Sequence, residues 1–214
     1  MERLNAQIEN VYTDEYQQMM DTEIADERDA KERTVDSIYT KVNPYGTNTT
    51  SMYVYFTTDY ATKIKYTVSA DGYPDFTRAV AQDEEYQKEH EFLVLGLIPD
   101  VENTITFTIT DDSGLDITQT ITHDGPSLLG VEEVQLERTV TADDGADLGD
   151  GLYAILGNDS DEQDFMYYYD TNGVLRGEIP VKYYRSHRLL FDDDGLMWFS
   201  ASTHTMVGMN RLGK

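Results

Sequence analysis

The sequence predicts an all-β protein: an amino-terminal amphipathic helix, an antiparallel Ig-like β-sandwich, and the first blade or blades of a truncated β-propeller. Three observations support this fold class. A stretch without Gly or Pro opens the chain, short β-branched and aromatic runs follow between turn residues, and strand-like segments recur near the carboxyl end at blade spacing. The expected divisions are a helix with a charged linker, a sandwich, a connector and a propeller start, at residues 1–36, 37–125, 126–151 and 152–214.

The composition limits the possible partners. Acidic residues outnumber basic ones by 41 to 16, and the formal net charge of −25 repels nucleic acid and anionic membranes over most of the surface. The absence of cysteine excludes disulfides, thiolate zinc sites and cysteine nucleophiles. The longest apolar run, Phe92 to Ile98, is too short to cross a bilayer, and the first residues form no apolar signal core. We therefore expect neither a nucleic-acid partner nor a transmembrane segment, and no targeting signal is visible.

The first element expected is a helix from about Leu4 to Lys31. Apolar residues recur there at helical spacing, for example at Ile8, Tyr12 and Met20. Acidic residues crowd the polar face, which disfavours a membrane-surface role, so the helix is expected to pack on its own domain or on a partner helix. The mixed-charge run "DERDAKER" follows as a solvated linker.

After Ser37 the sequence changes to six short runs that alternate apolar and polar positions, the period of half-buried strands. These runs are "SIYTKV", "SMYVYF", "TKIKYTVSA", "EFLVLGL", "NTITFTIT" and "LDITQTITH". The segment Asn43-Pro44-Tyr45-Gly46 stops pairing between the first two, because Pro lacks a ladder donor and Gly accepts a positive φ. Turn residues at 71–72 and 112–114 indicate hairpins, and the whole pattern indicates an antiparallel sandwich.

From Gly125 to about Gly151 the strands thin out into an acidic, glycine-rich connector, "TADDGADLGDG". Six further strand-like runs follow and contain an internal echo. The turn that ends at Gly173 recurs at Gly213, 40 residues later, and the segment that begins at Gly151 recurs at Gly195, 44 residues later. This is the spacing of propeller blades. Fewer than four blades cannot close a ring, so we expect an excerpt, or a split gene product, of a longer protein.

Segments of this chain resemble the amino-terminal domain of bacterial arylsulfate sulfotransferases, the group that works without a nucleotide sulfate donor. They are "VNPYGTNTTSMYVYFTT", "KIKYTVSA" and "EHEFLVLGLIPDVENTITFTITDDSG", which follow in the family's order over about residues 37–114. The blade-like tail is similar to the start of the family's propeller. The positions that match the family pattern are Asn43, Pro44, Tyr45, Gly46, His90, Gly96, Leu97, Pro99, Asn103, Thr104 and Gly114.

The resemblance implies transfer of a sulfuryl group from a phenolic sulfate ester to a phenol, through a sulfated histidine on a six-bladed propeller and without a cofactor. It also implies a bacterial, extracellular, cell-surface or periplasmic protein whose amino-terminal sandwich serves assembly, so a homo-oligomer is expected. The family's catalytic residues fall mostly on later blades. This chain is therefore expected to be a scaffold that is inactive alone. The alternative is a non-catalytic cell-surface binding or assembly module.

Few residues of this chain are candidates for the transfer chemistry. Sulfuryl transfer needs a nucleophile that carries the group and cations that face the sulfonate oxygens, and His and Arg suit these roles. The most basic window, "KYYRSHR", supplies Arg185, His187 and Arg188 as candidates, with blade-edge ion pairs as the other reading. We expect His90 to cap a turn or bind a backbone carbonyl. The two remaining histidines, His123 and His204, are expected to be structural or exposed.

Calcium is the competing chemistry, because hard cations prefer clustered oxygen ligands. The candidate ligands are Asp159, Asp161 and Asp164, but this stretch lacks the glycine and the distal glutamate of a complete EF-hand loop. We expect a solvated turn and no metal site there.

Overall fold

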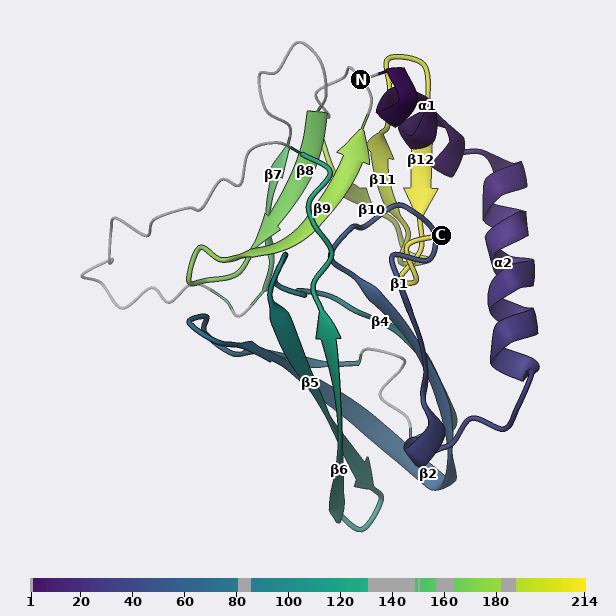
Figure 1. Ribbon diagram of the computed structural model, residues 1–214, viewed down its shortest axis with the longest axis vertical. Coiled ribbons are helices and arrows are strands. Elements are labelled where there is room, and N and C mark those ends of the chain that lie inside the picture. Colours follow the sequence, from purple (N-terminus) through teal and green to yellow (C-terminus); the bar gives the residue numbers. More distant parts are fainter. Residues whose placement is uncertain (1, 81–85, 131–148, 150, 157–163, 182–187) are drawn as a thin grey trace.

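The computed structural model describes residues 2–80, 86–130, 149, 151–156, 164–181 and 188–214, apart from the side chains of residues 2–5 and 164. These parts contain two α-helices, a short 3-10 helix (η1, Val35–Ser37), one six-stranded antiparallel sheet and two three-stranded antiparallel sheets. The expected fold class is confirmed: the chain is mostly β, with an amino-terminal helical segment, an Ig-like domain and blade-like sheets after it. The six-stranded sheet lies below the two smaller ones in Figure 1.

The amino-terminal segment forms two helices where the sequence indicated one. Helix α1 is Glu2–Val11 and helix α2 is Asp14–Asp29. Thr13 has an extended backbone between them, and its side chain accepts a hydrogen bond from the Tyr16 backbone N–H at 3.3 Å. Asp14 and Glu15 occupy the first turn of α2, where negative charge is favoured. The apolar period continues across the break, so it could not reveal where one helix ends.

The Ig-like domain is built around one long, bent strand. Its strands are β1 Tyr39–Val42, β2 Met52–Ala70, β3 Phe76–Ala79, β4 Gln87–Val94, β5 Glu102–Asp111 and β6 Asp116–Asp124. The first half of β2 pairs with β1 and β4, and the second half pairs with β3 and β5. The pairing of β2 with β4 shifts register between Thr57 and Thr62. The two halves therefore belong to two layers of an antiparallel sandwich.

Aromatic rings from three strands fill the space between the layers. Phe56 of β2 meets Phe92 of β4 edge to face, with ring centroids 6.3 Å apart, and lies 6.2 Å from Phe107 of β5. All three side chains are buried, and aliphatic residues from the same strands surround them. The alternation seen in the sequence is thus real, because every second side chain of β5 enters this core.

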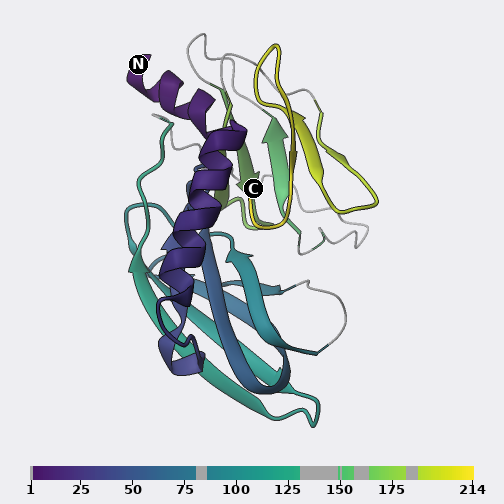
Figure 2. The same cartoon turned by 90° about the vertical axis from the view of Figure 1, so that its right-hand side faces the viewer.

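The carboxyl-terminal third forms two small antiparallel meanders. The first consists of β7 Tyr153–Leu156, β8 Asp164–Tyr169 and β9 Leu175–Val181, and the second of β10 Leu190–Phe191, β11 Met197–Ser200 and β12 Met206–Met209. They pack face to face through Met166, Ile179 and Val181 on one side and Phe199 and Met209 on the other. Figure 2 shows the two sheets stacked beside one another above the Ig-like domain.

One turn geometry recurs after β5, β8, β10 and β12. In each case the side-chain Oδ1 of the first residue accepts hydrogen bonds from the backbone N–H groups two and four positions later. The fourth residue is a glycine with φ between +77° and +82°. The first residues are Asp111, Asp170, Asp192 and Asn210. The echo between the turns ending at Gly173 and Gly213 therefore reflects a shared backbone conformation.

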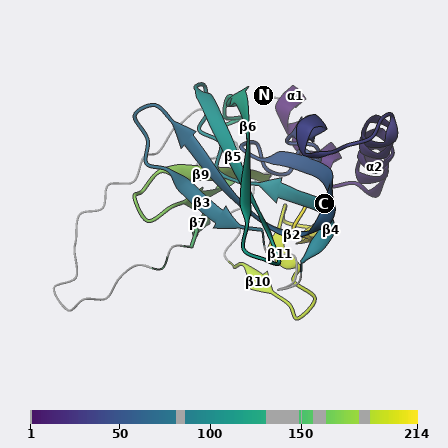
Figure 3. The same cartoon turned by 90° about the horizontal axis from the view of Figure 1, so that it is seen from below.

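Helix α2 lies along one side of the molecule (Figure 1). It runs beside the layer of β1, β2 and β4, on the side away from β3 and β9 (Figure 3). Met20 and Ile24 of the helix are buried against Tyr39, Tyr45 and Tyr53. No helix in the described part of the chain has the length and apolar character needed to cross a membrane.

Candidate functional site

Most of the candidate catalytic residues fall outside the part of the chain that can be described. Arg185 and His187 lie among the residues without a described structure. Arg188 is described, and it is exposed just before β10. Their role as sulfonate-facing groups stays a prediction.

The candidate calcium ligands are affected in the same way. Asp159 and Asp161 lie outside the described residues, whereas Asp164 begins β8 and pairs with Val181 through the backbone. Among the described residues no three His, Asp or Glu side chains are grouped so that they could hold a metal ion.

The three described histidines lie far apart in the sequence and in different surroundings. His90 is buried within β4, 2.8 Å from the Thr62 hydroxyl, with its ring 5.1 Å from that of Phe56. Burial lowers its pKa to about 4, so the ring is neutral at pH 7. His123 and His204 are exposed, on β6 and in the β11–β12 hairpin. His90 does not cap a turn, because β4 begins at Gln87, four residues earlier than the sequence indicated. The alternative expectation, a hydrogen bond to a backbone carbonyl, agrees with its hydrogen bond to the backbone of Gln87, which opposes the effect of burial on the pKa.

The turn from Asn43 to Gly46, before β2, and the residue that follows it contact three parts of the fold. Gly46 has a φ of +71°, and its N–H donates to Asn43 O at 3.1 Å, while Asn43 Oδ1 accepts from the Asn48 N–H. A Cβ atom at Gly46 would lie 2.4 Å from Cγ1 of Val11 at the end of α1. Further along the same segment, the Thr47 hydroxyl donates to Gly213 O in the last turn. This turn therefore holds α1 and the second small sheet against the Ig-like domain.

A buried arginine crosses the junction between the Ig-like domain and the first small sheet. Arg176 of β9 is 1% exposed and pairs with Asp170 at 2.8 Å. Its guanidinium also donates to Pro74 O at 2.7 Å and Gly96 O at 3.3 Å, and lies over the Phe76 ring. Burial lowers the pKa of Arg176, and the Asp170 carboxylate opposes that shift. Gly96 has to be glycine here, because a Cβ atom would lie 2.8 Å from the Phe76 ring.

A buried glutamate crosses the same junction two residues along β9. Glu178 is fully buried, and its carboxylate accepts from the Thr49 hydroxyl at 2.7 Å and from the N–H groups of Leu129 and Gly130 at 2.8 and 2.9 Å. Burial raises the pKa of Glu178, and the three hydrogen bonds oppose this shift because they stabilise the carboxylate. The carboxylate thus ties together the segment before β2, the segment after β6, and β9.

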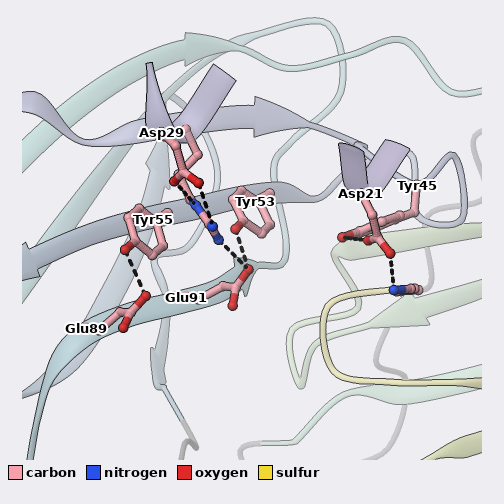
Figure 4. Close-up of polar contacts among 9 residues, drawn as sticks. Asp21, Asp29, Tyr45, Tyr53, Tyr55, Glu89 and Glu91 are labelled. Atoms are coloured by element: carbon pink, nitrogen blue, oxygen red, sulfur yellow. Dashed lines mark hydrogen bonds and ion pairs between the residues drawn. The ribbon is translucent and has the colours of Figure 1, made fainter. Parts of the chain in front are cut away.

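The seam between α2 and the sheet is polar at its rim. Figure 4 shows Tyr53 and Tyr55 of β2 pointing to Glu91 and Glu89 of β4, with O–O distances of 2.5 and 2.8 Å. Where α2 passes close to the carboxyl-terminal residue Lys214, Asp21 accepts a hydrogen bond from the Tyr45 hydroxyl at 2.9 Å and another from the Lys214 ammonium. The two Asp21 contacts hold α2 against the turn before β2 and the carboxyl terminus, whereas the two tyrosine–glutamate bonds join β2 to β4 within the sheet.

A cavity of about 470 Å³ lies where the Ig-like domain meets both small sheets. Leu93, Ile179, Met197 and Met209 give it apolar walls, and Tyr66 and Tyr168 add phenol rings. Its charged lining residues are Arg78 and Arg211, and none of the described residues that line it is an Asp or Glu. A second cavity, of about 460 Å³, lies between the α1–α2 break and β12. No described histidine lines either cavity.

The interface residues were not identified from the sequence. Arg176 and Glu178 were part of "GVLRGEI", which correctly predicted a strand. Two opposite charges at alternate positions of an otherwise apolar strand were the available signal, because such charges share one face. Burial on both faces of β9 could not be inferred from that signal.

Two family models match successive parts of the chain. Residues 39–126 match the "Arylsulfotransferase Ig-like domain", and residues 137–214 match "Arylsulfotransferase (ASST)". No protein in the curated collection matched the chain.

Proposed function

This chain belongs to the arylsulfotransferase family, and from that premise we propose that it forms the amino-terminal part of an enzyme that transfers sulfuryl groups between phenols. The donor would be a phenolic sulfate ester and the acceptor a second phenol. The observation that carries this proposal is the succession of the two matches, an Ig-like domain followed directly by the transferase domain.

The proposed reaction has two displacements. A histidine nitrogen attacks the ester sulfur, an N–S bond forms, the S–O bond to the aryl group breaks, and the leaving phenolate takes up a proton. The acceptor phenol then loses its proton and attacks the same sulfur, which breaks the N–S bond and frees the histidine. Cationic side chains facing the sulfonate oxygens would stabilise both transition states. The reaction needs no nucleotide sulfate donor.

We assign this chain a scaffold role within that enzyme, with no turnover of its own. In support, the described histidines line neither cavity, and His90 is enclosed by the sandwich core. The nucleophilic histidine and its arginine partners would come from other blades. As in the family it resembles, we place the enzyme in an extracellular, cell-surface or periplasmic location.

The test is a release assay with 4-nitrophenyl sulfate as donor and phenol as acceptor. The natural gene product that contains this sequence should release 4-nitrophenol in an acceptor-dependent manner, whereas the 214-residue chain should release none. The control is the same mixture of donor and acceptor without protein, which measures spontaneous hydrolysis of the donor. Failure of the natural gene product with several phenolic sulfates would refute the transferase, and turnover by this chain would refute its scaffold role.

An assembly module is the second candidate, and strand β6 favours it. This strand is the edge of the six-stranded sheet, it is exposed along most of its length, and it carries Ile117 with Leu115 just before it. An open edge with exposed apolar residues is a site for pairing with another strand. Light scattering of the chain should give a mass that rises with concentration and falls in Ile117→Lys. A monomer mass at every concentration would remove this candidate.

A further inference from the structure

The cavity between the Ig-like domain and the two small sheets has the size of a small-ligand site. Its volume of about 470 Å³ lies within the range in which proteins bind small molecules. Side chains from β2, β4, β9, β11 and β12 converge on it, so both the Ig-like domain and the blade sheets shape it. A ligand there would contact the two domains at once.

The charge of the cavity is opposite to that of the chain. The protein carries 41 acidic residues, yet the described lining has Arg78 and Arg211 and no carboxylate. Each guanidinium has five N–H donors, so an arginine that already contacts a protein group still presents donors to an anion. An anionic ligand is therefore favoured at this place, whereas most of the surface repels one.

The remaining lining favours a flat aromatic group. Met197 and Met209 offer adaptable thioethers, and Phe92 and Tyr168 offer rings that can pack against another ring. Tyr66 lies in the same wall and is almost fully buried. Its oxygen accepts from the Leu95 N–H at 3.1 Å, and no described residue accepts its hydroxyl proton. That proton is available to an oxygen atom of a ligand.

We propose that this cavity binds a small aromatic anion, an arene carrying one sulfonate, sulfate or carboxylate group. The ring lies among the methionines and aromatic side chains, and the anionic group faces the arginines and the Tyr66 hydroxyl. No described histidine lines the cavity, and the proposal concerns binding alone, with no transfer step. A binding measurement therefore tests it whether or not the transfer reaction is found.

The first experiment is calorimetric titration of the 214-residue chain with benzenesulfonate. Methanesulfonate keeps the anion without the ring, and benzenesulfonamide keeps the ring without the charge. We expect benzenesulfonate to bind at least about tenfold more tightly than either analogue. Benzoate distinguishes a carboxylate from a sulfonate ligand, and tighter binding of either supports the proposal. Equal or weaker binding of benzenesulfonate than of methanesulfonate would overturn it.

Two charge variants and one control locate the ligand. Arg78→Gln and Arg211→Gln should each weaken benzenesulfonate binding by about tenfold. Lys63→Gln removes the same charge from an exposed position of β2 outside the cavity, and it should change the affinity less than twofold. An equal effect of all three variants would mean that only net charge matters, and it would contradict the proposed site.

A second measurement on the unaltered chain avoids any question of folding. With ¹³C-methyl methionine labelling, benzenesulfonate should shift the methyl signals of Met197 and Met209, which line the cavity. The signal of Met19, exposed on α2, should stay in place. Shifts at Met19 without shifts at the two cavity methionines would contradict the proposal.

Discussion

Thr49 and Glu178 are joined twice across the domain junction. The Thr49 backbone N–H donates to Glu178 O at 2.9 Å, and its hydroxyl donates to Glu178 Oε1 at 2.7 Å. The pair links the signature segment before β2 to the edge strand of the first small sheet. The two family domains are therefore held together by buried polar groups as well as by apolar contact.

Removal of the Thr49 hydroxyl should loosen this junction. Thr49→Val leaves a fully buried carboxylate with one donor fewer, which costs about 1–3 kcal/mol in the free energy of unfolding. Thr118→Val, on the exposed strand β6, is the control and should change it by less than about 0.5 kcal/mol. Urea denaturation followed by fluorescence measures both. Equal stability of the two variants would show that the hydrogen bond contributes nothing.

The pH dependence of stability should reveal the Glu178 carboxyl. Burial raises its pKa, so the folded state binds this proton more readily than the unfolded state does. The contribution of Glu178 to the free energy of unfolding is therefore fully present at pH values below its pKa in the unfolded state. It is lost as the pH rises through its pKa in the folded state. Glu178→Gln should remove that loss, which denaturation curves between pH 4 and 7 would measure. If the difference in free energy of unfolding between the unaltered chain and Glu178→Gln stayed constant across this range, a raised pKa of Glu178 would be contradicted.

His90 should act in the opposite direction. Its folded pKa of about 4 lies below the ordinary histidine value, so its contribution is present above that ordinary value and is lost as pH falls through 4. The loss amounts to about 3 kcal/mol at most. His90→Gln should abolish this part of the acid sensitivity, whereas His204→Gln, at an exposed position, should retain it. Identical acid curves for both variants would refute a buried neutral His90.

The strands of the Ig-like domain show how far sequence patterns reach. The alternation of apolar and polar residues predicted β5 and β6 closely, because successive side chains of a strand point to opposite faces of the sheet. It also predicted two strands at 51–56 and 62–70, which are the two halves of the single strand β2. Polar residues at the bend resemble a turn in sequence, and only pairing with different neighbours on each side shows that the strand continues.

The Arg176–Asp170 pair provides a test with an internal control. Asp170→Asn keeps the turn, because Asn210 forms the same turn with an amide, but it removes the carboxylate that faces a fully buried guanidinium. We expect a loss of about 3–5 kcal/mol. Asp111→Asn makes the same change in the exposed β5–β6 turn and should cost less than about 1 kcal/mol. Similar losses in both variants would mean that the charge pair is immaterial.

Two glycines with the same backbone conformation distinguish the cost of a positive φ from the cost of a steric clash at the added Cβ. Gly46 and Gly72 have φ values of +71° and +81°. An added Cβ meets Cγ1 of Val11 at 2.4 Å in the first case and open space in the second. Gly72→Ala should cost about 1 kcal/mol, and Gly46→Ala at least about 2 kcal/mol more. Thermal unfolding compares them, and equal costs would show that α1 does not press on this turn.

The candidate site was less predictable than the fold. Turn signatures such as Asn43 to Gly46 follow from local chemistry, so they were found in the sequence. The cavity was not found, because its walls come from strands more than a hundred residues apart, such as Tyr66 and Met209. Arg78 and Arg211 carry no local signal either, since an arginine on a strand or in a turn looks the same whether it faces water or a cavity.

The most direct test of the proposed transfer function is a search for the covalent intermediate. The natural gene product that contains this sequence is mixed with 4-nitrophenyl sulfate, without an acceptor, and its intact mass is measured. The account predicts a gain of one SO₃ group on a histidine, lost again when phenol is added, and no such gain on the 214-residue chain alone. Release of 4-nitrophenol by the gene product with no protein-bound SO₃, or an adduct on the 214-residue chain, would contradict it.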